Sequence, residues 1–260
     1  MRTLFIGNSH TYFHDMPKIF RDLCLENGIE MQVTMLTKAG MGFDYHAENE
    51  QTRFNILYGD YDFIILQHVA HPMGDYGVME AGADRIMEWI RQTNAVPCYF
   101  MTWTEEDNEA FQPEMAARYR KLATKHNCLV APVGERWWEE YHKDPSTDLY
   151  YTDRQHASLT GSRLAAETIF ETLRPEQIAR ITRYEQMLQK AEYMIREGPE
   201  DPDALRDLIA ELEAYYTSDE WKKDFADDEA GLLPGNLKRG VLSEDGIHNL
   251  LSEYYEHDER

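Results

Sequence analysis

Residues 4–11 read Leu4-Phe-Ile-Gly-Asn-Ser-His-Thr11, in which an apolar run stops at a glycine and gives way to polar residues. A short apolar run closed by glycine is typical of a buried strand. Ser9 then falls on the turn before the next helix, where its hydroxyl would project from the carboxyl edge of a sheet. Backbone N–H groups at the start of that helix could face a developing oxyanion, which makes Ser9 a candidate nucleophile. The alternative is that Ser9 only caps the helix.

Strand-like and helix-like segments alternate as far as residue 173. Strands separated by helices predict βαβ units and a mostly parallel sheet. Ligands of such sheets bind at the carboxyl ends of the strands. We expect strands at residues 3–6, 30–36, 61–66, 95–101 and 128–131, and helices at residues 15–27, 78–92, 113–126, 134–142 and 159–173.

The pattern changes at Arg174-Pro175, after which the chain has almost no strand signal. We therefore expect two domains, residues 1–173 and a small α-helical domain of residues 174–260, the latter with a net charge of about −11. Its first helix carries an apolar stripe that needs a partner surface, and we expect the helical domain to pack with this stripe against the first domain. The alternative is that the stripe is covered in the helical domain's own core. The helices of this domain are expected at residues 177–196, 203–216 and 243–255.

The whole chain has 260 residues and a net charge of −22, from 48 acidic and 26 basic residues. Such a surface repels phosphate backbones and anionic lipids, so we expect neither nucleic acid nor a membrane as a partner. No run of 18 apolar residues is present, and the first apolar stretch is too short for a secretory signal. Cys24, Cys98 and Cys128 lie in apolar surroundings and are expected to be reduced core residues, which favours a cytoplasmic protein.

A second polar motif, Asp153-Arg-Gln-His156, stands just before the last expected helix of the first domain. Histidine is the usual general base for a serine nucleophile, and a carboxylate holds its tautomer. Asp153 is close enough in sequence to fold back onto the ring of His156 within one turn. The alternative is a capping aspartate and a surface histidine.

Taken together, the Gly-Asn-Ser and Asp-x-x-His motifs resemble those of the SGNH (GDSL-like) hydrolase superfamily over residues 1–173. The resemblance implies a three-layer α/β/α, flavodoxin-like fold with a parallel sheet. It also implies a catalytic triad in which Ser9 is the nucleophile, His156 the base and Asp153 the carboxylate that orients it.

The resemblance further implies an oxyanion hole formed by the N–H groups of Ser9 and of a glycine after the second strand. We assign Gly40 rather than Gly42, because Gly40 lies nearer the end of that strand. The family's next block usually reads Gly-x-Asn-Asp, but this chain reads Ile64-Ile-Leu-Gln-His-Val-Ala-His71. Gln67 supplies an amide donor there, and a subset of similar proteins carries Leu-Gln at this place; His68 or His71 could share the role.

Further histidines and aromatic residues fall near the expected edge of the sheet. The histidine pairs suit a pocket lining better than a metal site, since the sequence has no His-Glu-x-x-His. Glycine-rich nucleotide-binding motifs are also missing, so no cofactor is expected. The candidate pocket residues are His10, Tyr12, His46, His68, His71 and Trp103.

The segment from Pro175 to Tyr255 resembles a small bacterial helical domain family of unknown function. The resemblance rests on Tyr215-Tyr-Thr-Ser-Asp-Glu-Trp, on Asp228-Glu-Ala-Gly-Leu-Leu-Pro and on Asn236-Leu-Lys-Arg-Gly-Val-Leu-Ser-Glu-Asp-Gly-Ile247. It implies no activity.

The expected function is therefore that of a serine esterase that acts through an acyl-enzyme on a small-molecule ester. The superfamily includes many carbohydrate deacetylases, so an acetyl group on a carbohydrate is the leading substrate. Two alternatives remain: an acyltransferase with the same triad, and a non-catalytic binding or regulatory protein that uses its C-terminal domain. The sequence leaves the oligomeric state open.

Overall fold

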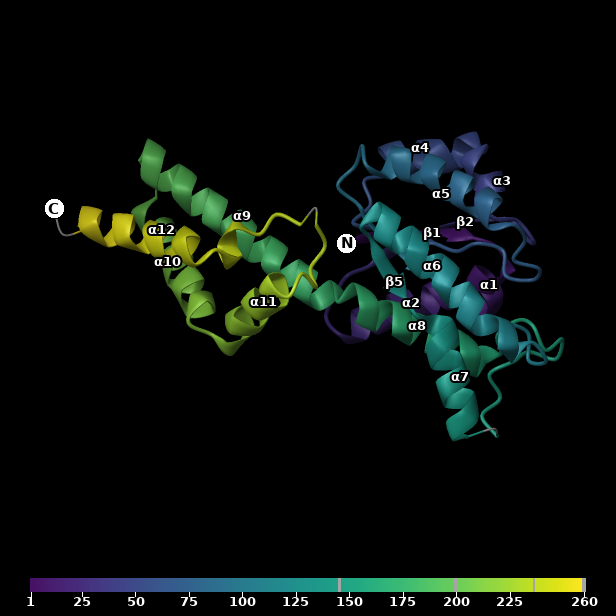
Figure 1. Cartoon of the computed structure of the whole chain (residues 1–260). Coiled ribbons are helices and arrows are strands. Elements are labelled where there is room, and N and C mark those ends of the chain that lie inside the picture. The colour runs from purple at the N-terminus through teal and green to yellow at the C-terminus, as the bar shows by residue number, and fades with distance from the viewer. Residues whose placement is uncertain (145, 199–200, 236, 259–260) are drawn as a thin grey trace. The chain divides into compact units, whose positions relative to one another are not determined.

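The computed structural model describes residues 1–144, 146–198, 201–235 and 237–258. The chain divides into two compact units, Met1–Pro175 and Glu176–Arg260 (Figure 1). The first unit is an α/β domain and the second is helical. Within the described residues, no helix is both long enough and apolar enough to cross a membrane.

A five-stranded parallel sheet forms the centre of the first unit, in the order β2-β1-β3-β4-β5. This order places the carboxyl ends of β1 and β3 next to each other, with Ile6 paired with Leu66. The strands are β1 (Arg2–Gly7), β2 (Gln32–Thr37), β3 (Phe63–Leu66), β4 (Val96–Phe100) and β5 (Leu129–Ala131).

Helices cover both faces of the sheet, which completes the three layers (Figure 1). On one face α2 packs against α8, and on the other α3, α5 and α6 share a core with the strands. The expected α/β/α fold is thus confirmed. The helices are α1 (Ser9–Tyr12), α2 (Met16–Glu26), α3 (Phe43–Ala47), α4 (Glu50–Tyr58), α5 (Tyr76–Ile90), α6 (Gln112–His126), α7 (Val133–Lys143) and α8 (Leu159–Leu173), with 3-10 turns η1 (Phe13–Asp15) and η2 (Glu109–Phe111).

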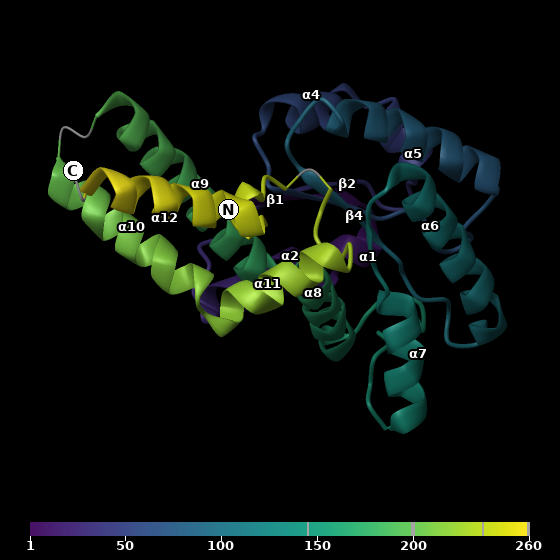
Figure 2. The same cartoon turned by 60° about the vertical axis from the view of Figure 1, so that its left-hand side comes forward.

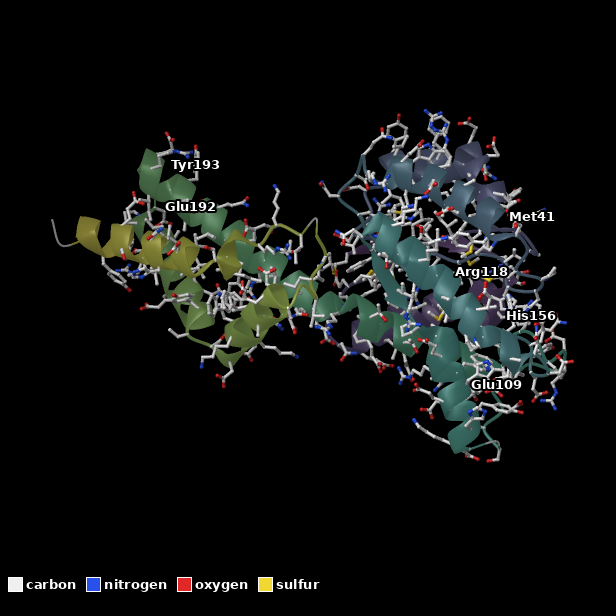
Figure 3. The ribbon with its side chains drawn as sticks, viewed as in Figure 1. Met41, Glu109, Arg118, His156, Glu192 and Tyr193 are labelled. Carbon is white, nitrogen blue, oxygen red and sulfur yellow. The ribbon has the colours of Figure 1, made fainter. Side chains whose placement is uncertain are left out.

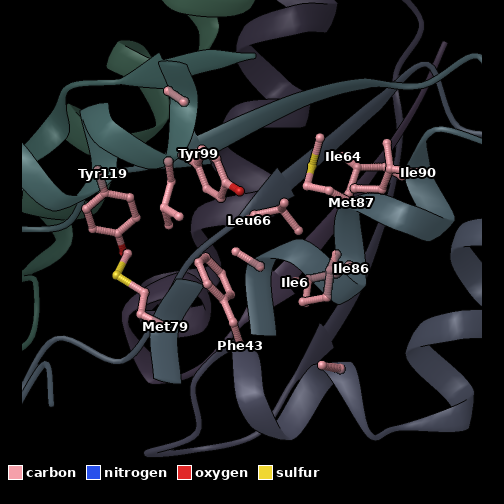
Figure 4. Close-up of a cluster of buried hydrophobic side chains, with 14 of the residues drawn as sticks. Ile6, Phe43, Ile64, Leu66, Met79, Ile86, Met87, Ile90, Tyr99 and Tyr119 are labelled. Atoms are coloured by element: carbon pink, nitrogen blue, oxygen red, sulfur yellow. The ribbon is translucent and has the colours of Figure 1, made fainter. Parts of the chain in front are cut away.

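The sheet core follows the two-residue alternation of side chains along a strand. Ile64 and Leu66 of β3 point into a cluster with Ile6 and Phe43 (Figure 4). Phe5 of β1 points to the other face and packs edge-on against the ring of Phe20, with ring centroids 5.5 Å apart. Because both faces are covered, every residue of β3 is buried, as the apolar run predicted.

Three short helices of the first unit, α1, α3 and α4, were not expected from the sequence. In α4 the apolar residues do not gather on one side of the helix, so its sequence carries no helical periodicity. Its start is fixed locally instead, by the side chain of Asn49, which accepts hydrogen bonds from the N–H groups of Gln51 and Thr52.

The second unit consists of helices around a core of its own (Figure 2). The apolar stripe of its first helix is covered there, since Ile181, Leu188 and Ala191 are buried among residues of the other helices. The elements are α9 (Pro175–Glu197), α10 (Pro202–Tyr216), α11 (Asp219–Glu229), the 3-10 turn η3 (Gly240–Leu242) and α12 (Glu244–Asp258).

Helix α11 was missed because its sequence is dominated by charged residues. One of them, Asp224, is fully buried and connects three helices. Its carboxylate accepts two hydrogen bonds from Arg180 of α9, at 2.8 and 2.6 Å, and one from the hydroxyl of Tyr215 of α10, at 2.8 Å. A carboxylate that is buried and paired in this way holds the helices in one arrangement.

Replacing Asp224 by Asn should destabilise the second unit by about 2–3 kcal/mol, because Arg180 would keep its charge without a carboxylate partner. Chemical denaturation followed by far-UV circular dichroism measures the loss. Asp219→Asn is the matched control, because that carboxylate is exposed and pairs with Lys222 on the same helix. Equal stability of D224N and D219N would contradict the structural role of Asp224.

Candidate active site

The turn that carries Ser9 is fixed by the residues on either side of it. Asn8, not Ser9, caps α1, because the Asn8 side chain accepts a hydrogen bond from the N–H of His10 at 3.1 Å. Gly7 precedes this turn at a point where a Cβ atom would collide with Thr11 and Gln67. The Ser9 hydroxyl is therefore not needed as a cap and is available for other contacts.

A second loop brings Asp153 and His156 to the same place from the other end of the first unit. One oxygen of Asp153 accepts hydrogen bonds from the N–H groups of Gln155 (3.0 Å) and His156 (2.9 Å). This closes a tight turn, so that the other oxygen meets Nδ1 of His156 at 2.6 Å. The indole N–H of Trp103 donates to the Gln155 carbonyl at 2.9 Å, and this hydrogen bond supports the turn.

The three predicted catalytic side chains form one continuous chain of contacts. Nε2 of His156 lies 2.8 Å from Oγ of Ser9, and Nδ1 of the same ring faces Asp153. In Figure 3, His156 lies at the surface of the first unit, on the same side as Met41. Partial burial would raise the pKa of Asp153, but the hydrogen bonds from His156 and Gln155 outweigh it and lower the pKa to about 2. Asp153 is thus ionised at neutral pH and can stabilise an imidazolium.

The hydrogen bonds of the Gln67 side chain differ from those expected of an oxyanion donor. Its side chain is fully buried, and its oxygen accepts hydrogen bonds from the N–H of Asn8 (2.8 Å) and the hydroxyl of Thr11 (3.0 Å). Its amide N–H group donates to the carbonyl of His68. The oxygen and the nitrogen of the amide both form hydrogen bonds with protein groups. The bonds of the oxygen connect the Ser9 turn to the end of β3.

Gly40 occupies an exposed turn after β2, with a φ of +70° that favours glycine. This turn is joined to the Ser9 turn, because the Asn8 side chain donates to the carbonyl of Met41 at 2.9 Å. Gly42, in contrast, is buried against the ring of His68. The exposed position of Gly40 agrees with its choice over Gly42, and its part in an oxyanion hole remains a prediction.

His46 and His68 are structural residues, which corrects their assignment to a pocket. Nε2 of His46 lies 2.8 Å from the carbonyl of Gly7, and Nδ1 of His68 accepts the N–H of Phe43 at 2.9 Å. Both rings are almost fully buried. Burial lowers the pKa of both, in the case of His68 to about 4, so both are neutral at pH 7. For His68 the hydrogen bond also requires this, because Nδ1 must be unprotonated to accept the N–H of Phe43.

His10 and His71 do lie beside the triad. The ring centroid of His10 is 4.9 Å from that of His156 and 4.7 Å from that of His71. Nδ1 of His71 is in turn 2.9 Å from a carboxylate oxygen of Glu105. Burial lowers the pKa of both histidines, and that of His10 falls well below its usual value. Among the residues that the structure describes, no cluster of His, Cys, Asp and Glu is arranged to hold a metal ion.

The aromatic residues near the triad are arranged differently from the expectation. Trp103 is fully buried and stacks on Trp137 with ring centroids 3.9 Å apart, so it supports the His156 turn and does not line a pocket. Tyr12 is half-buried and lies against Phe13. Phe13, which sequence reasoning missed, stacks directly on the ring of His156. Its position next to the Asn-Ser-His motif was the only signal that could have found it.

Comparison with known proteins separates the two units. Residues 179–260 match the family DUF4298, described as a domain of unknown function. No curated protein matches the chain significantly.

Solved structures of the SGNH hydrolase type align with about two thirds of this chain. A DUF4886 family protein from Bacteroides uniformis is 20% identical, with a TM-score of 0.53 over 66% of this chain and 82% of that chain. A GDSL-like lipase candidate from Parabacteroides merdae is 16% identical, with a TM-score of 0.53 over 65% of this chain and 94% of that one. A catalytic mutant of Axe2, an acetylxylan esterase from Geobacillus stearothermophilus, is 13% identical, with a TM-score of 0.51 over 65% and 92%. The first unit thus has the fold of the SGNH (GDSL-like) hydrolases, which confirms the fold expected from the sequence.

Gln67→Ala should lower the stability of the first unit by about 2 kcal/mol, because it leaves the buried N–H of Asn8 and hydroxyl of Thr11 without their acceptor. Thermal or urea denaturation followed by tryptophan fluorescence measures this. Gln92→Ala, which removes an exposed side chain that follows α5 and donates to the carbonyl of Glu88, is the control. If Q67A is as stable as Q92A but has lost turnover, Gln67 acts in the chemistry and not in the fold.

The first unit should also lose stability as the pH falls from 7 to 5. His10, His46, His68 and His71 have folded-state pKa values below the unfolded value of about 6.5, so the unfolded chain binds more protons in this range. The lowered pKa of His68 makes its contribution to the free energy of unfolding depend on pH. This contribution is fully present above about pH 6.5 and is lost as the pH falls toward 4, and the loss amounts to about 3 kcal/mol.

Urea denaturation at a series of pH values measures this dependence. His68→Gln should reduce the pH slope of stability, because it removes a buried group that the unfolded chain protonates in this range. A wild-type stability that is constant between pH 7 and 5 would contradict neutral, buried histidines.

Proposed function

We propose that the first unit is a serine esterase of the SGNH type, which hydrolyses a carboxylic ester through an acyl-enzyme. The observation that carries the proposal is the chain of contacts from Ser9 through His156 to Asp153, with distances of 2.8 and 2.6 Å. Nucleophile, base and orienting carboxylate are within hydrogen-bond reach of one another, as this chemistry requires.

In the first step, Oγ of Ser9 attacks the ester carbonyl while its proton passes to Nε2 of His156. The negative charge of the tetrahedral intermediate develops next to the start of α1, where the N–H of Ser9, together with that of Gly40 across the Asn8–Met41 contact, would stabilise it. The imidazolium, held by Asp153, then protonates the leaving alcohol. A water molecule deprotonated by His156 attacks the acyl-enzyme and releases the acid, which restores Ser9.

The favoured substrate is a small acyl group, such as acetyl, on a carbohydrate. Support comes from the similarity in fold to an acetylxylan esterase. Next to Phe13 and His156 the surface also carries the ring of Tyr151, which is 42% exposed. An exposed aromatic ring suits the apolar face of a sugar ring.

The test is hydrolysis of p-nitrophenyl esters of increasing acyl length and of acetylated oligosaccharides. Ser9→Ala should lower the rate roughly 10⁴-fold, by analogy with other triads. It should leave the melting temperature unchanged, because Ser9 does not cap α1. Ser252→Ala, at an exposed serine of α12, is the matched control and should keep full activity. Turnover by S9A close to that of the wild type, or a wild-type protein inactive on the whole panel, would contradict the proposal.

A further inference from the structure

The imidazole of His156 is in contact with two other rings. Phe13 covers one face of the imidazole, with ring centroids 4.1 Å apart and planes inclined by only 9°. The ring centroid of His10 is 4.9 Å from that of His156, with an inclination of 31° between the ring planes. Contacts of this kind restrict rotation of the His156 ring, whose two nitrogens must face Ser9 and Asp153 at once.

The backbone that follows Phe13 is strained at two consecutive residues. His14 and Asp15 both have left-handed backbone angles, with φ of 51° and 54°. Each such residue costs about 1 kcal/mol or more when it is not glycine. Asp15 precedes α2, but its side chain makes no capping hydrogen bond that would repay this cost.

What the strained turn does achieve is the placement of Phe13. The chain reverses directly after α1, and the carbonyl of Phe13 accepts a hydrogen bond from the hydroxyl of Ser162 on α8 at 3.1 Å. The ring of Tyr151 packs edge-on against the ring of Phe13. Backbone and side chain of Phe13 are therefore held from two sides, with the ring face turned to His156.

A benzene ring presents a partial negative charge on its face, which attracts a cation above it. The proposed reaction turns His156 into a cation each time Ser9 gives up its proton. From these contacts we infer that Phe13 is a positioning residue that fixes the His156 ring and stabilises its imidazolium form. The inference rests on the proposed function for its catalytic consequence, but the stacking itself can be tested without turnover.

The titratable groups around His156 are compatible with this role. Asp153 faces Nδ1, and the ring of His10 contacts that of His156. His71 contacts His10 in turn, and Glu105 contacts His71. Burial lowers the pKa of His10 well below its usual value, so it places no like charge beside the imidazolium. The ring of His14 lies nearly perpendicular to that of Phe13, with ring centroids 6.1 Å apart.

The test compares Phe13→Leu, which keeps most of the apolar volume but removes the ring face, with Phe13→Tyr, which keeps the face. The titration of His156 is followed by NMR of ring-labelled histidine in the full chain. In F13L the midpoint should move to lower pH by about 0.4–1 unit, the size expected for loss of a cation–π contact. In F13Y it should stay within about 0.2 unit of the wild type. Phe54→Leu, at an exposed ring that stacks on Tyr58, controls for aromatic loss elsewhere.

Kinetics provide the second readout. F13L should lower kcat/KM several-fold and move the acidic limb of its pH profile in the same direction as the NMR midpoint, whereas F13Y and F54L should not. An unchanged midpoint in F13L, or an equal shift in F13L and F13Y, would overturn the inference. An inactive wild-type protein whose midpoint still shifts in F13L would contradict the proposed function and leave the stacking role standing.

Discussion

The hydrogen bonds of the Gln67 side chain are the constraint on which the site depends. A parallel sheet brings the ends of β1 and β3 together, but it does not determine how the chain turns after β1. Gln67 does so, because its buried oxygen accepts from both Asn8 and Thr11, the residues on either side of Ser9 and His10. Gly7 leaves the space that this contact needs. Ser9 is thereby held at a fixed point, half-buried, although it makes no capping bond of its own.

The loop that carries Asp153 and His156 is also held by local hydrogen bonds. Asp153 forms its own turn through two backbone N–H groups and uses its remaining oxygen on His156. Trp103, from the loop after β4, supports that turn, and Phe13 covers the ring that it presents. Each of the two loops is held by hydrogen bonds of its own, so little conformational entropy is left to lose when an ester binds.

Sequence reasoning found what periodicity and motif spacing encode. The buried strands, the long amphipathic helices and the Ser9, Asp153 and His156 side chains all lie where the pattern placed them, because a strand end and a tight turn depend on near neighbours in the chain. It failed where a side chain's partner is distant in sequence. Three polar side chains were expected to take part in the chemistry, namely those of Gln67, His46 and His68. Each instead forms a hydrogen bond with a group 25 or more residues away in the chain. Helix α11 was missed because its fold depends on Asp224, whose partners lie on other helices.

Covalent trapping at Ser9 tests the central claim most directly. The protein would be treated with a fluorophosphonate, and intact mass and peptide mapping would show how many groups add and where. Our account predicts a single adduct on Ser9 that forms rapidly in the wild type and is lost in His156→Ala, because only the paired imidazole activates the hydroxyl. No adduct in the wild type, an adduct on another residue, or equal labelling of H156A would contradict it.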